Sequence, residues 1–389
     1  MDLFRQNDIS PTDKQQEITT LLIAAENGDE KAQATLGTMY AEGVEVEQDD
    51  EQAVDWYMKA ANQGNVHAQF NLGNMYNSGI GIPQDYEQAV AWYRKAAEHN
   101  HISSQYNLGF MLTKGKGAPQ DYQEAAAWYR KAADQGHAKA QSNLGIMYAK
   151  GQGVPLDYEQ AVDWNRKSAA QGNASAQFNL GNMYNNGKGI RQDYQQATAW
   201  YKKAADQGVV EAQYNLAVMY ENGQGVPLDY YQAADWYRKA ADRGYASAQC
   251  NLGNLYVRGD GVTKDDNQAV FWYQKSAEQG NASAQFNLGI AYLTGEGICQ
   301  DHKQASDWFR KAAEQGFAEA QYDLGVMYVK GLGVPRDTIT GCAWYCLAAA
   351  QGDKDAAQER DQVASKLSFE ELTQVQALTT ELQSQMVSH

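Results

Sequence analysis

A segment of fourteen residues recurs twice in this chain with few changes. It reads AQFNLGNMYNSGIG from Ala68, AQFNLGNMYNNGKG from Ala176 and AQFNLGIAYLTGEG from Ala284, at intervals of 108 residues. Weaker copies divide each interval into thirds and extend the series, and they begin at Ala32, Ser104, Ala140, Ala212, Ala248 and Ala320. A fixed period of 36 residues predicts an array of stacked structural units, because a unit of this size cannot bury its apolar surface alone.

Residues 65–100 illustrate the structure that each repeat is expected to form. The first half carries apolar residues at the i, i+4, i+7 and i+8 spacing of one helical face, which predicts an amphipathic helix, here named helix A. Glycine and proline in residues 79–84 predict a tight connection. Asp85 follows at the place of an N-cap, and an acidic residue recurs at this position in every repeat. A second helix, helix B, is therefore expected after Asp85, and each repeat is a helix–turn–helix unit.

All nine tryptophans occupy one position of helix B. They are Trp56, Trp92, Trp128, Trp164, Trp200, Trp236, Trp272, Trp308 and Trp344. A catalytic or ligand-stacking tryptophan would not be needed nine times. We therefore expect these side chains to pack between helices, with small residues such as Ala68, Gly73 and Ala89 leaving room for the indole.

Several spaced residues of the repeat carry a resemblance to a known family. In residues 65–100 they are Leu72, Gly73, Tyr76, Gly79, Gly81, Ala89, Trp92, Ala96 and Ala97. With the 36-residue period, they resemble the Sel-one-like repeat, which has a longer connection than the similar tetratricopeptide repeat. The resemblance implies an all-α fold, an α/α right-handed superhelix (solenoid) of 36-residue helix–turn–helix repeats. It also implies a role as an adaptor or assembly scaffold, in bacteria often tied to signalling, envelope processes or host contact.

The ends of the repeat pattern divide the chain into regions. The pattern predicts an N-terminal segment with a capping half repeat at residues 1–31, nine repeats at residues 32–355, and C-terminal capping helices at residues 356–389. In the first region Ser10, followed by proline, is expected to open a helix. In the last region Ser368 and Glu371 have the spacing of a capping box, which predicts another helix start.

Charge and hydropathy narrow the classes of partner. The formal net charge is −16, from 48 acidic and 32 basic residues, and such a surface repels nucleic acid and anionic membranes. No run of 18 apolar residues could span a bilayer, and the first residues do not resemble a secretory leader. The four cysteines fall at four different places in the repeat and give no disulfide framework. We expect a cytoplasmic monomer that binds no nucleic acid and inserts into no membrane.

Catalytic motifs are not found in the sequence. H-E-x-x-H, G-x-S-x-G, S-x-x-K and a P-loop do not occur. Cys342 and Cys346 share a helix face at i, i+4, where packing is favoured over a metal or redox role. We therefore expect no enzyme activity, no cofactor and no metal. Some relatives with a cysteine pair in every repeat have been linked to β-lactamase activity, so a hydrolase of that type is the least favoured alternative.

Variable positions of helix A are the best guide to a binding site, because packing already explains the constant positions. The positions equivalent to residues 67, 70, 74 and 77 lie opposite the face that meets helix B, and this face lines the concave groove in superhelices of helix pairs. The predicted partner-binding groove comprises Phe70, Asn74, Asn77, Tyr106, Phe178, Asn182, Asn185, Tyr214, Phe286, Ile290, Leu293, Tyr322, Val326 and Val329. The alternative for its aromatic residues is packing between successive A helices.

Basic residues gather at the margin of this groove. Lys114, Lys150, Arg258 and Lys330 occupy one repeat position against a single acid, Glu42, so the local sum is 4 − 1 = +3. We expect a non-enzymatic scaffold whose groove accepts a protein or a neutral to mildly acidic peptide with apolar anchors. The alternative is binding of a glycan or peptidoglycan fragment along the aromatic ladder.

Overall fold

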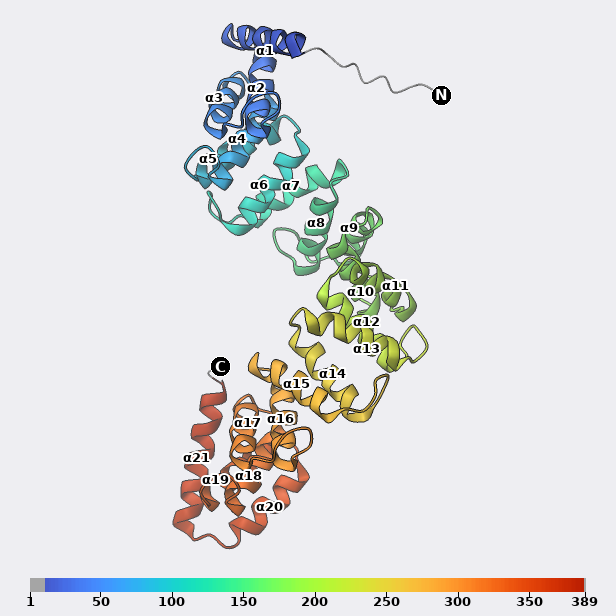
Figure 1. The fold of residues 1–389 in the computed structure, drawn as a ribbon. Helices are drawn as coiled ribbons and strands as arrows, with labels where there is room; N and C mark the ends of the chain where they lie inside the picture. Colours follow the sequence, from blue (N-terminus) through green and yellow to red (C-terminus); the bar gives the residue numbers. More distant parts are fainter. Residues whose placement is uncertain (1–10, 388–389) are drawn as a thin grey trace. The chain divides into compact units, whose positions relative to one another are not determined.

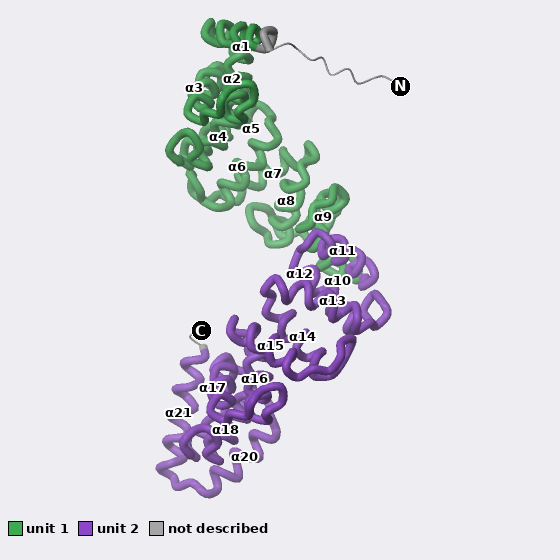
Figure 2. The backbone as a smooth tube through the Cα atoms, viewed as in Figure 1, with its two compact units in different colours: residues 1–192 green, residues 193–389 purple. Residues whose placement is uncertain are grey.

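The computed structural model describes residues 11–387, and side chains from residue 15 to 386. Within that part of the chain it contains 21 helices and no strand (Figure 1). Two compact units divide the chain, residues 1–192 and residues 193–389 (Figure 2). The expected all-helical solenoid of 36-residue repeats is confirmed.

The helices alternate between helix A and helix B of successive repeats. In the first unit they are α1 (Pro11–Glu26), α2 (Glu30–Glu42), α3 (Asp50–Asn62), α4 (Val66–Ser78), α5 (Tyr86–Glu98), α6 (Ile102–Lys114), α7 (Tyr122–Asp134), α8 (Ala138–Lys150), α9 (Tyr158–Ala170) and α10 (Ala174–Asn186). In the second they are α11 (Tyr194–Asp206), α12 (Val210–Asn222), α13 (Tyr230–Asp242), α14 (Ala246–Arg258), α15 (Asp266–Glu278), α16 (Ala282–Thr294), α17 (His302–Glu314), α18 (Ala318–Lys330), α19 (Thr338–Ala350), α20 (Lys354–Ala364) and α21 (Phe369–Val387). Even numbers from α2 to α18 are A helices, and odd numbers from α3 to α19 are B helices.

The predicted helix ends are confirmed wherever the structure describes them. The Asp85 carboxylate accepts hydrogen bonds from the backbone N–H groups of Glu87 and Gln88, at 2.9 and 3.0 Å. Helix A of the same repeat ends at Gly79, whose φ of 75° lies in the left-handed region. The capping box is present too. Ser368 N–H donates to the Glu371 carboxylate at 2.7 Å, and Glu371 N–H donates to the Ser368 hydroxyl at 3.3 Å. The expected cap at Ser10 lies outside the described residues.

Each tryptophan of helix B packs as expected, with a contact that the sequence pattern alone did not indicate. Trp92 is buried, and the Lys95 Nζ lies 3.7 Å from the centroid of its ring. A lysine three residues after the tryptophan covers the indole in this way in eight of the nine repeats. The exception is Trp344, where the buried Leu347 takes the lysine's place.

Glycines set how closely the helices approach. A Cβ added at Gly73 would lie 2.7 Å from ring atoms of Tyr93, so helix A and helix B of one repeat meet across this glycine. A Cβ added at Gly81 would lie 2.2 Å from the carbonyl oxygen of Asp50, in the preceding repeat. In the first repeat, which has no complete repeat before it, the same position is Glu45 with a φ of 61°.

A ladder of buried glutamines also joins neighbouring repeats. The Gln105 side chain donates to the carbonyl of Ala97 in the preceding repeat at 3.2 Å, and its Oε1 accepts from Gln135 Nε2 at 2.8 Å. Equivalent bonds recur along both units. Since an unpaired buried amide would be costly, this ladder helps to fix the register of one repeat on the next.

The last two helices do not form a tenth repeat. α20 packs on α19 as an A helix would, but α21 turns back along α19 and reaches α17 (Figure 1). Val375 of α21 is buried against a cluster that includes Cys342 and Tyr345. The C-terminal helices therefore cover apolar surface of the final repeat.

Candidate partner-binding surface

The structure places the predicted groove residues on one face of the A helices, here named the A-helix face. All fourteen are half-buried, and the four basic residues at the margin are exposed. Hydrogen bonds and ring contacts engage many of these side chains.

The aromatic residues of this face pack against two neighbours. The Tyr106 ring lies 5.9 Å from Tyr129 of helix B and 4.6 Å from His137, the N-cap of the next helix A. Equivalent ring contacts involve Phe70, Tyr214, Phe286 and Tyr322. Burial raises the pKa of Tyr129 to about 12, as expected for a hydroxyl held away from water. Packing therefore uses part of each of these half-buried rings.

The asparagines of the face also have partners. Asn74 Oδ1 accepts from the Tyr93 hydroxyl at 2.7 Å and from Asn107 Nδ2 at 3.5 Å. Asn254 repeats this arrangement in the second unit, with Tyr273 and Asn287. An asparagine on helix A therefore ties helix B of its own repeat to helix A of the next repeat.

The apolar residues near the C-terminal end lie at the edges of core clusters. Ile290 and Leu293 pack beside a cluster around Phe309 and Leu324. Val326 and Val329 pack beside the cluster that α21 covers. These side chains support the stack as well as facing outward.

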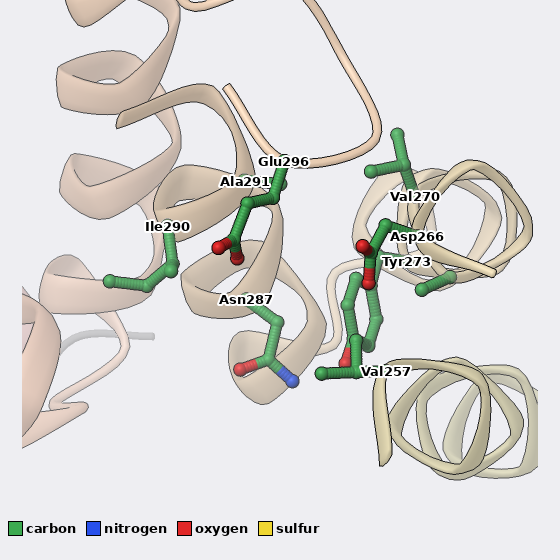
Figure 3. Close-up of a pocket in the computed structure, with 9 residues that line it drawn as sticks. Val257, Asp266, Val270, Tyr273, Asn287, Ile290, Ala291 and Glu296 are labelled. Carbon is green, nitrogen blue, oxygen red and sulfur yellow. The ribbon is translucent and has the colours of Figure 1, made fainter. Parts of the chain in front are cut away.

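Three cavities open on the A-helix face between successive A helices. The first, between α4 and α6, has a volume of about 240 Å³ and brings together Asn74, Asn77 and Tyr106. The second, between α8 and α10, has about 290 Å³ and includes Lys150 and Asn182. The third, between α14 and α16, has about 130 Å³ and includes Ile290; Figure 3 shows side chains from α14, α15, α16 and the loop after α16 around it.

The sequence pattern missed several residues that line these cavities. They are Asn107 and Phe110 in the first, Asn165, Asn179 and Lys188 in the second, and Asp266, Asn287 and Glu296 in the third. Lys188 and Glu296 lie in the connecting loop, and Asn165 and Asp266 lie on helix B, so a search limited to helix A could not find them. Two signals were available: Phe110 occupies the helix A position of Asn74, and Asn165 interrupts a helix B position that is aromatic in every other repeat.

The four basic margin residues differ in their pairing. The Arg258 guanidinium forms ion pairs with Glu221 at 2.9 Å and Asp260 at 3.0 Å. No ion pair joins Lys114, Lys150 or Lys330 to a carboxylate in the described part of the chain. Uncompensated positive charge on this face therefore comes from the lysines.

Two clusters of titratable groups lie near the C-terminal end. Burial and the charge of Asp353 raise the pKa of Asp323 to about 6. Cys342 and Cys346 interact on α19, where the hydrogen bond between them raises the pKa of Cys342 and lowers that of Cys346 to about 7. The described residues hold no group of three or more His, Cys, Asp or Glu arranged for a metal ion. None of the described helices has the length and apolar character needed to cross a bilayer.

Comparison with known proteins gives consistent matches. A family model described as Sel1 repeat matches nine consecutive segments, residues 30–65, 66–101, 102–137, 138–173, 174–209, 210–245, 246–281, 282–317 and 318–353. A protective antigen of uropathogenic Escherichia coli with an SLR fold is 37% identical, with a TM-score of 0.69 over 98% of this chain and 90% of that one. A Sel1 repeat protein from Oxalobacter formigenes is 34% identical, with a TM-score of 0.61 over 79% and 90%. No curated protein matched.

Proposed function

Because the chain belongs to the Sel1 repeat family, whose repeats typically build protein–protein interaction scaffolds, we propose that it is a non-enzymatic scaffold that binds a partner on its A-helix face. The partner would be a protein or an extended peptide. In this proposal residues 32–355 provide the binding array, and residues 356–389 cap its C-terminal end.

The observation that carries the proposal is the row of cavities between A helices. Packing, capping or turn geometry accounts for the constant residues of the repeat, whereas several cavity-lining residues change from one junction to the next, as Lys188 and its equivalent Glu296 do. A face that varies on a constant framework can recognise a partner without altering the fold. The fourteen groove residues and the lysines Lys114, Lys150 and Lys330 would contribute to this surface.

The lining residues also favour binding over catalysis. Asparagine amides, tyrosine hydroxyls and aliphatic groups predominate, and these groups suit a peptide backbone and its side chains. A hydrolase of β-lactamase type would need a serine activated by a nearby lysine in an S-x-x-K motif, which the sequence does not contain.

Affinity capture from lysate of the source organism tests the proposal. The bait would be the full chain, compared with a Phe110→Ser and Val257→Ser double variant, because these side chains are 40% and 39% exposed on the A-helix face. The matched control is Leu228→Ser with Phe271→Ser, at 56% and 45% exposure on a loop and on helix B. We expect proteins that are retained by the wild type and the control and lost with the A-helix variant. Equal capture by all three baits would contradict the assigned face.

A further inference from the structure

Two of the cavities are equivalent positions of the array, 108 residues apart. Seven of the nine residues that line the α14–α16 cavity lie 108 positions after residues that line the α8–α10 cavity. The pairs are Ala149/Val257, Tyr158/Asp266, Asn165/Tyr273, Asn179/Asn287, Asn182/Ile290, Met183/Ala291 and Lys188/Glu296. The same backbone positions thus frame two cavities whose side chains differ.

The first difference is a missing aromatic ring. Seven of the nine repeats carry tyrosine at the position of Tyr273 and one carries phenylalanine, but the fourth repeat carries Asn165. Asn165 is 1% exposed, its Nδ2 donates to the Ala161 carbonyl at 2.8 Å, and its Oδ1 accepts from Asn179 at 3.4 Å. The cavity lined by this shorter side chain has about 290 Å³, against about 130 Å³ where Tyr273 is present and about 240 Å³ where Tyr93 is present.

The second difference is the sign of the charge. Lys150 and Lys188 line the α8–α10 cavity, and no acidic residue does. Neither lysine forms an ion pair with a carboxylate among the described residues. In the α14–α16 cavity Asp266 and Glu296 occupy the equivalents of Tyr158 and Lys188 (Figure 3), and the equivalent of Lys150 is the ion-paired Arg258.

We propose that the α8–α10 cavity binds the carboxylate side chain of an aspartate or glutamate in an extended peptide. Lys150 and Lys188 would donate charge-assisted hydrogen bonds to the carboxylate, and the amides of Asn179 and Asn182 would bind the adjoining peptide backbone. Ile146 and Met183 supply an apolar wall for the stem of that side chain. This inference rests on the proposed function, because it names one chemical feature of the partner.

Size and charge together favour a peptide side chain over other anions. A cavity of about 290 Å³ is just below the range of roughly 300–1,000 Å³ that is usual for whole small-molecule ligands, but it holds one or two side chains. A nucleic acid would present many phosphates to a chain whose net charge is −16. The acidic surface would repel most of the length of the nucleic acid. A single carboxylate on an otherwise neutral segment meets only the local positive charge.

Selection from a library of random heptapeptides displayed on phage tests the proposal. Each heptapeptide is flanked by fixed residues on both sides, so any carboxylate that it offers comes from a side chain. The full chain is compared with a Lys150→Gln and Lys188→Gln double variant. A Lys303→Gln and Lys366→Gln double variant is the matched control, because it removes the same charge from exposed positions that lie outside the A-helix face and line none of the three cavities.

A second variant fills the cavity without changing its charge. Asn165→Tyr would place a ring over Gly145, as Tyr273 lies over Gly253 in the equivalent repeat. Circular dichroism would confirm that all the variants are as helical as the wild type. All of the lysines exchanged are exposed, so we expect no loss of fold from them.

We expect the wild type and the control to enrich peptides containing aspartate or glutamate, and the two cavity variants to lose this enrichment. For a selected peptide, exchange of its acidic residue for the matching amide should weaken Kd about tenfold, as measured by fluorescence anisotropy. Selected peptides without acidic enrichment, or enrichment kept by the double-lysine variant, would overturn the carboxylate site while leaving peptide binding intact. Selection of no peptide at all would overturn it too, and the capture experiment would then decide the proposed function independently.

Discussion

The α8–α10 and α14–α16 cavities show what this array can change and what it must keep. Both lie where helix A of one repeat meets helix A of the next, and both have an asparagine, Asn179 or Asn287, at the same place on the wall. The loop and margin residues around them vary in charge without touching the core. Asn165 and Tyr273 are different, because this position belongs to the core and to the cavity at once. A change at this position therefore alters the cavity lining and the packing of the repeat together.

The largest expected effect is a difference in the free energy of unfolding between alanine substitutions at Tyr273 and at Asn165. Tyr273→Ala removes a buried ring and the hydrogen bond from its hydroxyl to Asn254 at 2.7 Å, so we expect a cost of about 3–5 kcal/mol. Asn165→Ala removes mainly a bond to the Ala161 carbonyl of its own helix, and we expect a cost of about 1 kcal/mol. Urea unfolding followed by circular dichroism measures both.

Hydrogen exchange provides the local control for this comparison. Stability in a repeat array is a sum over neighbours, so the loss in Tyr273→Ala should concentrate in α14–α16. Equal costs for the two alanine variants would mean that Asn165 is a packing residue like any other at this position, and the contrast between the cavities would lose its basis.

The reverse substitution is the second prediction. Asn165→Tyr restores the common residue of the repeat, and its hydroxyl could accept from Asn179 as the Tyr237 hydroxyl accepts from Asn251 at 3.0 Å. Burial of the ring should outweigh the lost amide bond, so we expect a gain of about 2 kcal/mol in the free energy of unfolding. A higher urea midpoint with loss of acidic-peptide selection would show that stability and cavity volume are exchanged at this residue. A lower midpoint would mean that the neighbouring side chains no longer accommodate the ring.

The fold was predictable because it depends on features that repeat. The aspartate N-caps, the loop glycines and the tryptophan position each recur at a fixed spacing, and local chemistry at each is enough to predict a helix start, a turn or a packed side chain. Contacts between repeats were harder to foresee. The glutamine ladder joins residues of different helices, and their proximity depends on how the helices pack.

The candidate site was predictable only in part, because its lining also depends on contacts between different helices and loops. A helical wheel identifies residues such as Asn74 and Asn182 on the outward side of helix A, and the structure places them at cavities. It cannot show that Asn74 is engaged by Tyr93, or that Lys188 of a loop reaches the helix A wall of a cavity. Those facts depend on tertiary packing between different elements of the repeat.

A third junction extends the comparison to pH. At the position of Asn179 and Asn287 the last repeat has Asp323, and its helix B neighbour is Phe309, which has no hydroxyl. Burial and the charge of Asp353 raise the Asp323 pKa to about 6, above the value of about 3.9 for an unfolded aspartate. The folded state therefore binds this proton more tightly. Stability from this group is fully present below about pH 4 and is lost as the pH rises through about 6.

Replacement of the Asp323 carboxyl tests the direction of this pH dependence of stability. Asp323→Asn should raise the free energy of unfolding by roughly 1–2 kcal/mol at pH 7 and by almost nothing at pH 4, because only the ionised carboxylate is penalised. Urea titrations at both pH values give the two differences. The matched variant Asn287→Asp should lose stability at pH 7 for the same reason. A gain for Asp323→Asn that is equal at both pH values would assign the effect to hydrogen bonding of the amide instead of to charge.

The smallest expected effect concerns the charges around the α14–α16 cavity. Glu296→Lys gives this cavity a lysine at the position that Lys188 occupies in the α8–α10 cavity. The new lysine would lie beside Asp266, whereas Lys188 lies beside Tyr158. Two carboxylates line the present cavity. Asp266 pairs with the Lys264 Nζ at 3.8 Å, which is a long contact between partly exposed groups. The exchange replaces repulsion by attraction, and for an exposed pair we expect a gain of about 0.5 kcal/mol in the free energy of unfolding.

Salt dependence distinguishes this charge effect from packing. The gain in Glu296→Lys should appear at about 0.05 M sodium chloride and largely vanish at about 1 M, where the screening length falls to roughly 3 Å. The reciprocal exchange Lys188→Glu faces Tyr158, an uncharged ring that lies 5.8 Å from the lysine Nζ, so its stability should change little at either salt concentration. A gain that persists in high salt would mean that the lysine stem, and not its charge, stabilises the loop. The difference between the cavities would then reflect side-chain packing throughout, and their opposite charges would act only on what they bind.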